Sequence, residues 1–213
     1  MFITFEGIEG SGKGSVIATV AEYLRAAGRE ALLTREPGGC RLGRALRTQL
    51  LDMRNAGITP EAELFLYLAD RAQHVHEIIV PALRAGKVVI CDRYSDSTLA
   101  YQGYGRGRDA ALLRSLNDVA AKGLKPDLTL LLDLPAAEGL ARARARNILE
   151  NKVESEGRFE AEDLAFHCLV REGFLELARQ ESERFAVIDA SRPLTEVSAE
   201  ACRLVGRQLG LPA

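Results

Sequence analysis

The sequence lacks several features that would place it in other classes of protein. None of its apolar runs approaches the ~20 residues that a membrane-spanning helix needs, so we expect no membrane segment. Positive and negative side chains nearly balance at a formal net charge of -2, so no overall field attracts nucleic acid or an anionic membrane. No signal peptide is recognisable, because the N-terminus leads straight into an apolar strand. The expected compartment is therefore the cytoplasm.

The cysteines do not form the pairs that mark metal sites or disulfide frameworks. Cys40, Cys91, Cys168 and Cys202 lie far apart and include no CxxC pair. They are expected to be separate reduced thiols. The sequence also has no internal repeat and no low-complexity segment. With 213 residues, 47% of them hydrophobic and 27% charged, it is typical of one globular domain, with or without a small lid.

What the sequence does contain is a phosphate-binding motif at its start. The short apolar strand that begins at Phe2 runs into Gly7, and the residues up to Lys13 fit G-x-x-x-x-G-K-[ST] except at its last position. Glycine permits positive φ and close backbone approach, so the loop amides can surround phosphate oxygens at the start of the next helix. The predicted ATP-binding residues here are Gly7, Ile8, Glu9, Gly10, Ser11, Gly12, Lys13, Gly14 and Ser15.

Position 14 departs from this motif. A serine or threonine there normally gives Mg²⁺ a hydroxyl ligand, but the residue is Gly14, and Ser15 follows one place late. Either Ser15 or a water molecule fills the metal position, or metal binding and turnover are weakened. These alternatives stay open at this point.

Hydrophobic patterning predicts alternating strands and helices. Strands are expected at about 2–5, 31–34, 87–91, 128–132 and 185–188, and helices at about 13–27, 42–51, 59–84, 109–122, 136–146, 160–183 and 194–209, with a bend at Pro81 and a loop over 147–157. This alternation predicts a parallel sheet covered on both faces. Ligands of such sheets bind beyond the carboxyl ends of the strands, where the loops 7–13, 35–39 and 92–98 should converge.

Charged residues follow the strand ends that such a sheet would bring together. Asp92 ends an apolar strand, where a carboxylate can hold Mg²⁺ directly or through water. Arg35 and Arg93 each follow a strand end, and two guanidinium groups beside a phosphate loop indicate a second phosphate site. Arg47, on the next helix, is either a further phosphate ligand or part of a solvated helix face.

A basic cluster lies further along the chain. Arg142, Arg144 and Arg146 fall close together, and Arg158 follows a polar stretch. An exposed run of charge is usually a solvated face. In a phosphate-binding protein it can instead form a lid that excludes water and places cations on the transferring phosphoryl group. We expect one domain over residues 1–213, with this lid inserted at approximately 142–160.

Five blocks of the sequence together resemble bacterial thymidylate kinases. They are Phe5 to Lys13, Thr34 to Gly39, Asp92 to Tyr94, Ser97 to Gly103 and Pro126 to Thr129, in an order and spacing that cover nearly the whole chain. The resemblance implies an α/β P-loop fold in three layers, with a five-stranded parallel sheet in the order 2-3-1-4-5. It implies transfer of the γ-phosphoryl group of ATP to dTMP, with Mg²⁺, by a homodimer.

The resemblance also implies residue roles. Tyr67 stands where these kinases usually stack a phenylalanine on thymine, Arg71 looks like the arginine that bonds a thymine carbonyl, and Tyr101 like the tyrosine that leaves no room for a ribose 2′-OH. The implied catalytic residues are Lys13, Arg93, Glu9 and Arg158; the remaining substrate-binding residues are Arg35, Pro37, Arg47, Arg93, Ser97, Thr98 and Gln102; Arg142 and Arg146 bind ATP; and Asp92, Ser15 and Glu9 are the metal candidates. Glu36-Pro37 resembles a cis peptide of the family, and Gly157 replaces the aspartate that usually precedes the lid arginine.

Two other functions compete with this interpretation. One is a kinase for another pyrimidine monophosphate such as dUMP, because one methyl group changes binding by only ~1–3 kcal/mol. The other is a nucleotide-binding protein whose catalysis is impaired by Gly14, against which the intact arginine and base-pocket residues argue. The histidines His74, His76 and His167 are expected to be packing or surface residues, since phosphoryl transfer has no obvious place for a histidine base.

Overall fold

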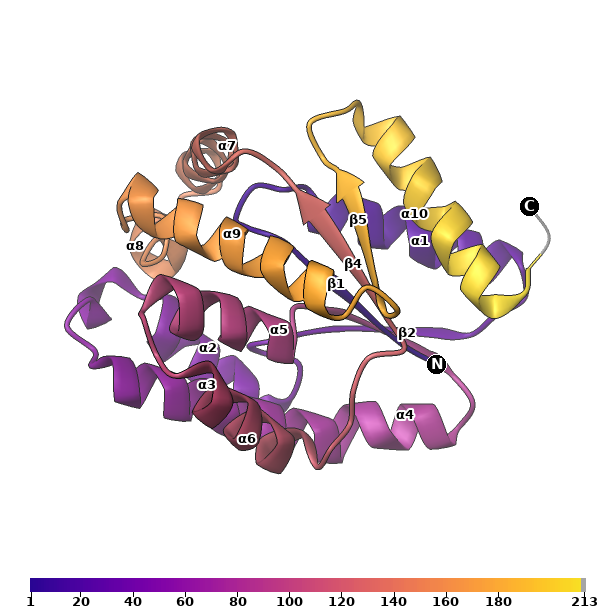
Figure 1. Ribbon diagram of the computed structural model, residues 1–213, viewed down its shortest axis with the longest axis horizontal. Helices are drawn as coiled ribbons and strands as arrows, with labels where there is room; N and C mark the ends of the chain where they lie inside the picture. The colour runs from indigo at the N-terminus through magenta and orange to yellow at the C-terminus, as the bar shows by residue number, and fades with distance from the viewer. Residues whose placement is uncertain (212–213) are drawn as a thin grey trace.

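The computed structural model describes residues 1–211 and is built around one five-stranded parallel sheet (Figure 1). The strands are β1 (Phe2–Glu6), β2 (Ala31–Arg35), β3 (Val88–Asp92), β4 (Leu128–Asp133) and β5 (Phe185–Asp189). Their order is β2-β3-β1-β4-β5, which confirms the predicted fold class and sheet order. The fully buried β1 lies in the centre, where Thr4 is in register with Cys91 of β3 and Thr129 of β4.

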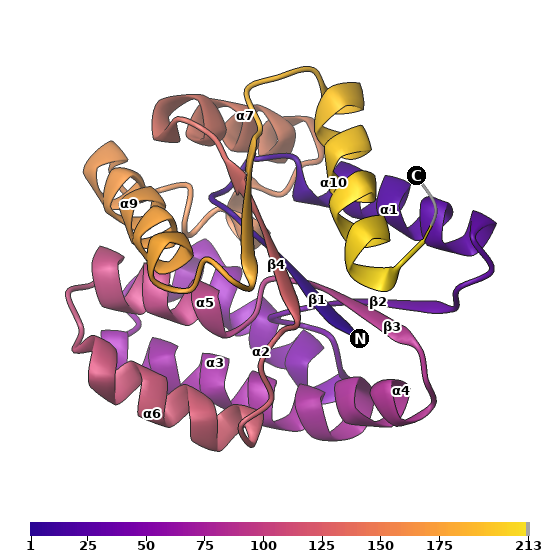
Figure 2. The same cartoon turned by 45° about the vertical axis from the view of Figure 1, so that its right-hand side comes forward.

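Helices cover both faces of the sheet. They are α1 (Lys13–Ala26), α2 (Arg41–Leu51), α3 (Pro60–His74), α4 (Val80–Arg84), α5 (Ser95–Thr98), α6 (Ala110–Ala121), α7 (Ala136–Leu149), α8 (Val153–Glu156), α9 (Leu164–Gln180) and α10 (Leu194–Leu209). Figures 1 and 2 show α1 and α10 together on one face, and α3, α4 and α6 on the other. None of the helices within residues 1–211 is long and apolar enough to cross a membrane.

Apolar side chains from the strands form the core. The larger core group includes Ile3, Phe5 and Leu130, packed against Val16 and Val20 of α1. A smaller group gathers around Phe2, where the ring of Tyr94 packs edge-on at 4.9 Å between centroids. The strands are apolar along most of their length, and the charged residues Glu6, Arg35 and Asp92 stand at their carboxyl ends.

Three expected segments differ from the structure. The helix expected over 59–84 is interrupted by a π-helical turn at Val75–Ile79, just before Pro81, whose missing N–H cannot continue the α-helical pattern. The helix expected from 160 begins only at Leu164, because the Asp163 carboxylate caps it by accepting from the N–H of Phe166 at 2.7 Å. The loop expected over 147–157 contains the end of α7 and the short α8.

Candidate active site

A cavity of about 440 Å³ lies beyond the carboxyl ends of β1, β2 and β3. The three loops predicted to converge do meet there, joined by residues of α2, α3, α5 and α7. The predicted site residues that line it are Glu9, Gly10, Ser11, Gly12, Lys13, Gly14, Ser15, Arg35, Pro37, Arg47, Tyr67, Arg71, Asp92, Arg93, Ser97, Thr98, Tyr101, Gln102, Arg142 and Arg146. Gly7, Ile8 and Arg158 do not line it.

The phosphate loop holds its lysine inward. Lys13 Nζ donates to the carbonyl oxygens of Gly7 at 2.9 Å and Ile8 at 3.0 Å. Gly7 and Ile8 do not line the cavity because both residues are buried and their carbonyl oxygens are bonded to Lys13. Burial, together with the nearby Arg93 guanidinium, lowers the pKa of Lys13 to about 8, against the opposing effect of neighbouring carboxylates. Anionic phosphate oxygens in the cavity would favour the charged form.

Close backbone packing fixes the loop against the next layer. Gly10 has φ 72°, and a Cβ built there would lie 2.1 Å from the carbonyl oxygen of Gly139 on α7. A Cβ at Gly139 would lie 2.6 Å from the carbonyl oxygen of Glu9. The loop and the first turn of α7 therefore touch backbone to backbone, with no side chain between them.

Glu9 and Arg93 form an ion pair in the cavity wall. Arg93 has the left-handed φ of 69°, which is uncommon for a residue other than glycine and is found at functional sites. This conformation accompanies a guanidinium that donates to Glu9 Oε1 at 3.0 Å and lies over the Tyr101 ring at 5.0 Å. The Tyr101 hydroxyl donates to the same oxygen at 2.5 Å. Burial alone would raise the pKa of Glu9, but Arg93, His167 and Tyr101 hold it below its ordinary range.

His167 lies behind this pair. It is buried on α9, with Nδ1 3.4 Å from Glu9 Oε2 and Nε2 3.1 Å from the carbonyl oxygen of Phe159. A carbonyl only accepts, so Nε2 carries a hydrogen. The residue packs in the interior as expected, but it also contacts the lid segment and a site carboxylate, which sequence reasoning missed.

The side of the cavity that is predicted to bind the acceptor contains Arg71. Its guanidinium is 1% exposed and donates to Glu36 Oε2 at 2.9 Å and to Thr98 and Asn117 at 2.9 and 2.6 Å. Glu36 also accepts from His74 Nδ1 at 2.9 Å. The Glu36-Pro37 peptide bond is cis, as expected. These bonds set the plane of the Arg71 guanidinium without any ligand.

Aromatic rings and arginines complete this side. Phe159, which sequence reasoning missed, packs 6.5 Å from the Tyr67 ring and 5.5 Å from the Tyr101 ring, between centroids. Arg35 is exposed on the cavity wall, and Arg47 donates to the Pro37 carbonyl at 3.3 Å and to Glu156 of α8 at 3.0 Å. The cavity is thus apolar between the rings and cationic at the strand ends.

Ser97 lines the cavity, and its hydroxyl also contacts two charged residues. Its hydroxyl donates to Glu6 Oε2 at 2.6 Å and accepts from Arg93 Nη1 at 3.2 Å. Both contacts are explained by its place in the first turn of α5, directly after the Arg93 loop. It therefore supports Arg93, while Thr98, one residue on, supports Arg71.

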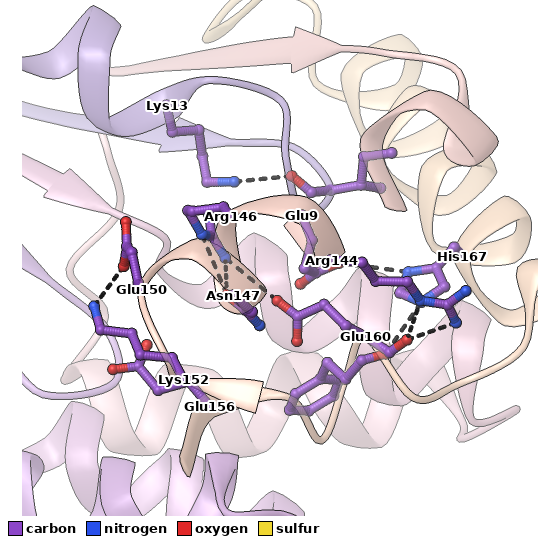
Figure 3. A network of polar contacts seen from close by, with 12 residues as sticks. Glu9, Lys13, Arg144, Arg146, Asn147, Glu150, Lys152, Glu156, Glu160 and His167 are labelled. Atoms are coloured by element: carbon purple, nitrogen blue, oxygen red, sulfur yellow. Dashed lines mark hydrogen bonds and ion pairs between the residues drawn. The ribbon is translucent and has the colours of Figure 1, made fainter. Parts of the chain in front are cut away.

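The basic cluster divides into three environments. Arg142 and Arg146 line the cavity from α7, and Arg146 also donates to Glu160 and Asn147 at 3.3 and 3.1 Å (Figure 3). Arg144 turns away and donates to the Glu160 carbonyl at 2.9 Å. The prediction that Arg158 acts at the reacting phosphates finds no support in its position: it is 5% exposed and donates to Glu63 and to the Leu50 carbonyl. The ion pair with the buried Glu63 carboxylate holds the Arg158 side chain in the protein interior.

Comparison with known proteins decides the family. Residues 5–201 match the family model of thymidylate kinase. A thymidylate kinase of Nitratidesulfovibrio vulgaris (strain DSM 19637 / Miyazaki F) is 60% identical over 100% of this chain and 99% of its own, and one of Desulfovibrio desulfuricans is 60% identical over 95% and 93%. The crystal structure of thymidylate kinase from Ehrlichia chaffeensis superimposes with a TM-score of 0.76 at 36% identity, covering 96% of this chain and 98% of that one.

The chain belongs to the thymidylate kinase family. The match to the family model extends over the phosphate loop and over the helix that carries Tyr67 and Arg71. It also makes the departure at Gly14 the main question about this member.

The residues that are predicted to hold the metal in this thymidylate kinase site leave space beside Gly14. Gly14 has an ordinary φ, and a Cβ added there would have no atom within 4 Å, so a larger side chain fits. Ser15 is exposed and lines the cavity. Asp92 Oδ1 is buried and has no hydrogen-bond partner, while the buried Glu9 Oε2 lies 3.4 Å from His167 Nδ1. Residues 1–211 hold no cluster of three His, Cys, Asp or Glu side chains that would bind a metal by themselves.

Glu6 is a buried acid beneath the site, and it gives a pH prediction. Its carboxylate accepts from the N–H of Tyr94 at 2.8 Å, and burial raises its pKa from 4.5 to about 7. The folded state then binds more protons than the unfolded state, so stability falls as the pH rises from 4.5 towards 7 and levels off above it. Glu6→Gln mimics the protonated acid. We expect the free energy of unfolding of Glu6→Gln, measured relative to that of the wild type, to be roughly 3 kcal/mol higher at pH 8 than at pH 4.5.

Urea unfolding of both proteins at pH 4.5, 6 and 8 measures this difference, and the comparison cancels groups that the two proteins share. A wild-type minus variant difference that stays constant with pH would contradict the raised pKa of Glu6.

Proposed function

We propose that the protein transfers the γ-phosphoryl group of ATP to dTMP, giving dTDP and ADP for dTTP synthesis. One observation supports this: the same cavity is lined by the predicted phosphate loop, by arginines at the strand ends and by the rings of Tyr67, Tyr101 and Phe159. Two phosphate sites facing each other are what transfer between two nucleotides needs. The names of relatives that are 60% identical over nearly the whole chain support dTMP as the acceptor.

The residues of the chain supply alignment and charge. Lys13 would exchange its carbonyl partners for the β- and γ-phosphate oxygens, and Arg93 would bridge donor and acceptor phosphates. Arg35 and Arg47 would hold the dTMP phosphate, with thymine stacked on Tyr67 and hydrogen-bonded to Arg71. Tyr101 and Glu9 would lie under the sugar. Such a reaction needs positioning and electrostatic stabilisation more than covalent chemistry from the protein.

Mg²⁺ is the expected cofactor, and the residues present fit it. Asp92 keeps one buried carboxylate oxygen without a partner, Glu9 Oε2 faces only the weak contact with His167 at 3.4 Å, and Ser15 of α1 lines the same cavity. Mg²⁺ is usually held by one or two carboxylates together with water and substrate phosphates. When bound, it would neutralise charge on the phosphates of ATP.

The prediction for position 14 follows from this arrangement. Gly14→Thr would add a hydroxyl ligand in open space, and would also remove a glycine from the first turn of α1, worth up to ~1 kcal/mol. We expect a lower Mg²⁺ concentration for half-maximal rate and a higher kcat at limiting Mg²⁺, with the gain shrinking at saturation. Initial rates against Mg²⁺ at fixed ATP and dTMP, for both proteins, measure this. Superimposable curves would mean that the loop already compensates through Ser15 or water.

A coupled assay of ADP release tests the proposed function against its alternatives. The acceptors are dTMP, dUMP, dCMP, dGMP and AMP, with Mg²⁺ titrated. We expect dTMP to give the highest kcat/KM and dUMP a slower rate. A higher rate with another monophosphate would reassign the substrate, and no transfer to any acceptor at saturating Mg²⁺ would favour the impaired nucleotide-binding protein.

The lid, the oligomer and the compartment complete the proposal. We propose that residues 142–160 close over ATP, with Arg142 and Arg146 contributing the cations. We also propose a homodimer through α3 and α6, where Phe65, Leu112 and Val119 are 60%, 54% and 78% exposed on two helices that pack together. Light scattering should give twice the chain mass, falling to the chain mass in Val119→Asp. The cytoplasm, where ATP is available as donor, is the proposed compartment.

A further inference from the structure

A buried carboxylate joins the wall of the base pocket to the lid. Glu63 of α3 is 1% exposed and accepts from Gln102 Nε2 at 3.1 Å and from Arg158 Nη2 at 2.5 Å. Arg106 lies 3.5 Å from both of its oxygens and donates in turn to Glu162 at 2.6 Å. The two carboxylates and two guanidinium groups balance in charge. Nothing in the proposed phosphoryl transfer uses Glu63, although a buried carboxylate is costly unless it is fully paired.

These contacts fix the orientation of the Gln102 amide. Two guanidinium groups donate to the Glu63 carboxylate, so its oxygens act as hydrogen-bond acceptors. The Gln102 amide must therefore turn its NH₂ group towards Glu63. Its carbonyl oxygen is then the polar atom left for a ligand. Gln102 is 2% exposed and lines the cavity, so a molecule in the cavity is what this oxygen meets.

We propose that Glu63 is a positioning residue that decides which pyrimidine the site accepts. The inference rests on the proposed function, because it takes the cavity wall at Gln102 to face the acceptor base. An amide oxygen accepts a hydrogen bond from the N3–H group of thymine or uracil. N3 of cytosine carries no hydrogen, so two lone pairs would face each other and leave a buried oxygen unpaired.

The same geometry predicts which substrates are separated and which are not. A site built to hydrogen-bond one group rejects an analogue that lacks it much more strongly than it rejects the loss of a methyl group. Glu63, through Gln102, thus discriminates against dCMP. It does not distinguish dTMP from dUMP, which share the N3–H group.

Glu63→Gln tests the proposal, because a glutamine at 63 can donate as well as accept and lets the Gln102 amide turn over. We expect kcat/KM for dTMP and for dUMP to fall together by roughly tenfold or more. The rate with dCMP should stay the same or rise. The dTMP/dCMP ratio then falls while the dTMP/dUMP ratio holds. A merely structural role would lower all three rates in proportion.

Glu162→Gln is the matched control. It removes a carboxylate from the same network, bonded to Arg106 but not to Gln102. Both ratios should stay at their wild-type values. If this variant lowers the dTMP/dCMP ratio as much as Glu63→Gln does, the effect comes from the network at large and the proposal is overturned.

The remaining outcomes are also decisive. An unchanged dTMP/dCMP ratio in a folded Glu63→Gln, checked by thermal unfolding, overturns the role of Glu63. Failure of the wild type to phosphorylate dTMP instead removes the proposed function itself. Should Glu63→Gln not fold, NMR of the wild type replaces it: the Gln102 side-chain amide, assigned by its loss in Gln102→Met, should exchange its hydrogens slowly. Exchange of both hydrogens at the solvent rate overturns the proposal.

Discussion

Lys13→Ala is expected to abolish turnover while leaving dTMP binding largely intact. Lys13 belongs to the donor loop, where its buried ammonium already faces the loop carbonyls at 2.9 and 3.0 Å and the cavity beyond them. Removing one preorganised donor that stabilises developing charge costs about 100- to 1,000-fold in kcat. Because Lys13 carries a full positive charge and is buried, we expect its removal to lower kcat by an amount at or above the upper end of that range. The acceptor pocket at Arg71 and Tyr67 is untouched by the change.

Steady-state rates with ATP and dTMP, and calorimetric titration with dTMP alone, separate the two effects. Lys87→Ala is the matched control, since Lys87 precedes β3 at the opposite edge of the sheet, where it pairs with Glu30. It should keep both turnover and dTMP affinity. Comparable losses of dTMP affinity and turnover in Lys13→Ala would count against the division into donor and acceptor halves.

Arg71→Ala is expected to raise the KM for dTMP strongly and to destabilise the fold. Its guanidinium is the partner of the buried Glu36, and removing one member of a buried ion pair costs about 3–5 kcal/mol of stability. The base would also lose a buried hydrogen bond worth ~1–3 kcal/mol, which corresponds to roughly a 5- to 150-fold increase in KM. Tyr67→Ala should raise the KM by a similar factor, because stacking of a base on an aromatic ring is worth ~1–3 kcal/mol.

A control separates the binding effect from the loss of stability. Arg184 also forms an ion pair with a buried carboxylate, that of Asp96, but it does not line the cavity. Arg184→Ala should therefore lower the unfolding midpoint and leave the KM for dTMP near the wild-type value. If Arg71→Ala and Tyr67→Ala both keep the wild-type KM, the acceptor pocket has been placed wrongly.

The sequence was sufficient for the features that depend on local pattern. Apolar strands that end at Glu6, Arg35 and Asp92 bring three loops to one edge of a parallel sheet, so most of the cavity wall follows from the strand order. The spacing of the residues from Gly7 to Lys13 is enough to predict a phosphate loop. These features needed no knowledge of which side chains meet.

Contacts between distant segments could not be read in the same way. Arg158 and Glu63 are 95 residues apart in the sequence, and only the packing of the lid segment against α3 shows that this arginine is paired inside the protein. Phe159 and His167 approach the site by the same packing. A lone phenylalanine or histidine carries no spacing signal that separates a cavity wall from an ordinary core position.

The backbone contact between Gly10 and Gly139 limits how the lid can move. The same contact reaches Ala143, whose amide nitrogen would lie 3.1 Å from a Cβ at Gly10. The first two turns of α7 are therefore coupled rigidly to the phosphate loop and would shift only with it. For the lid proposed over approximately 142–160, this contact would place the hinge after Ala143, so that the backbone at Arg142 stays with the loop while Arg146 moves. One helix would thus carry a stationary cation and a mobile one, four residues apart.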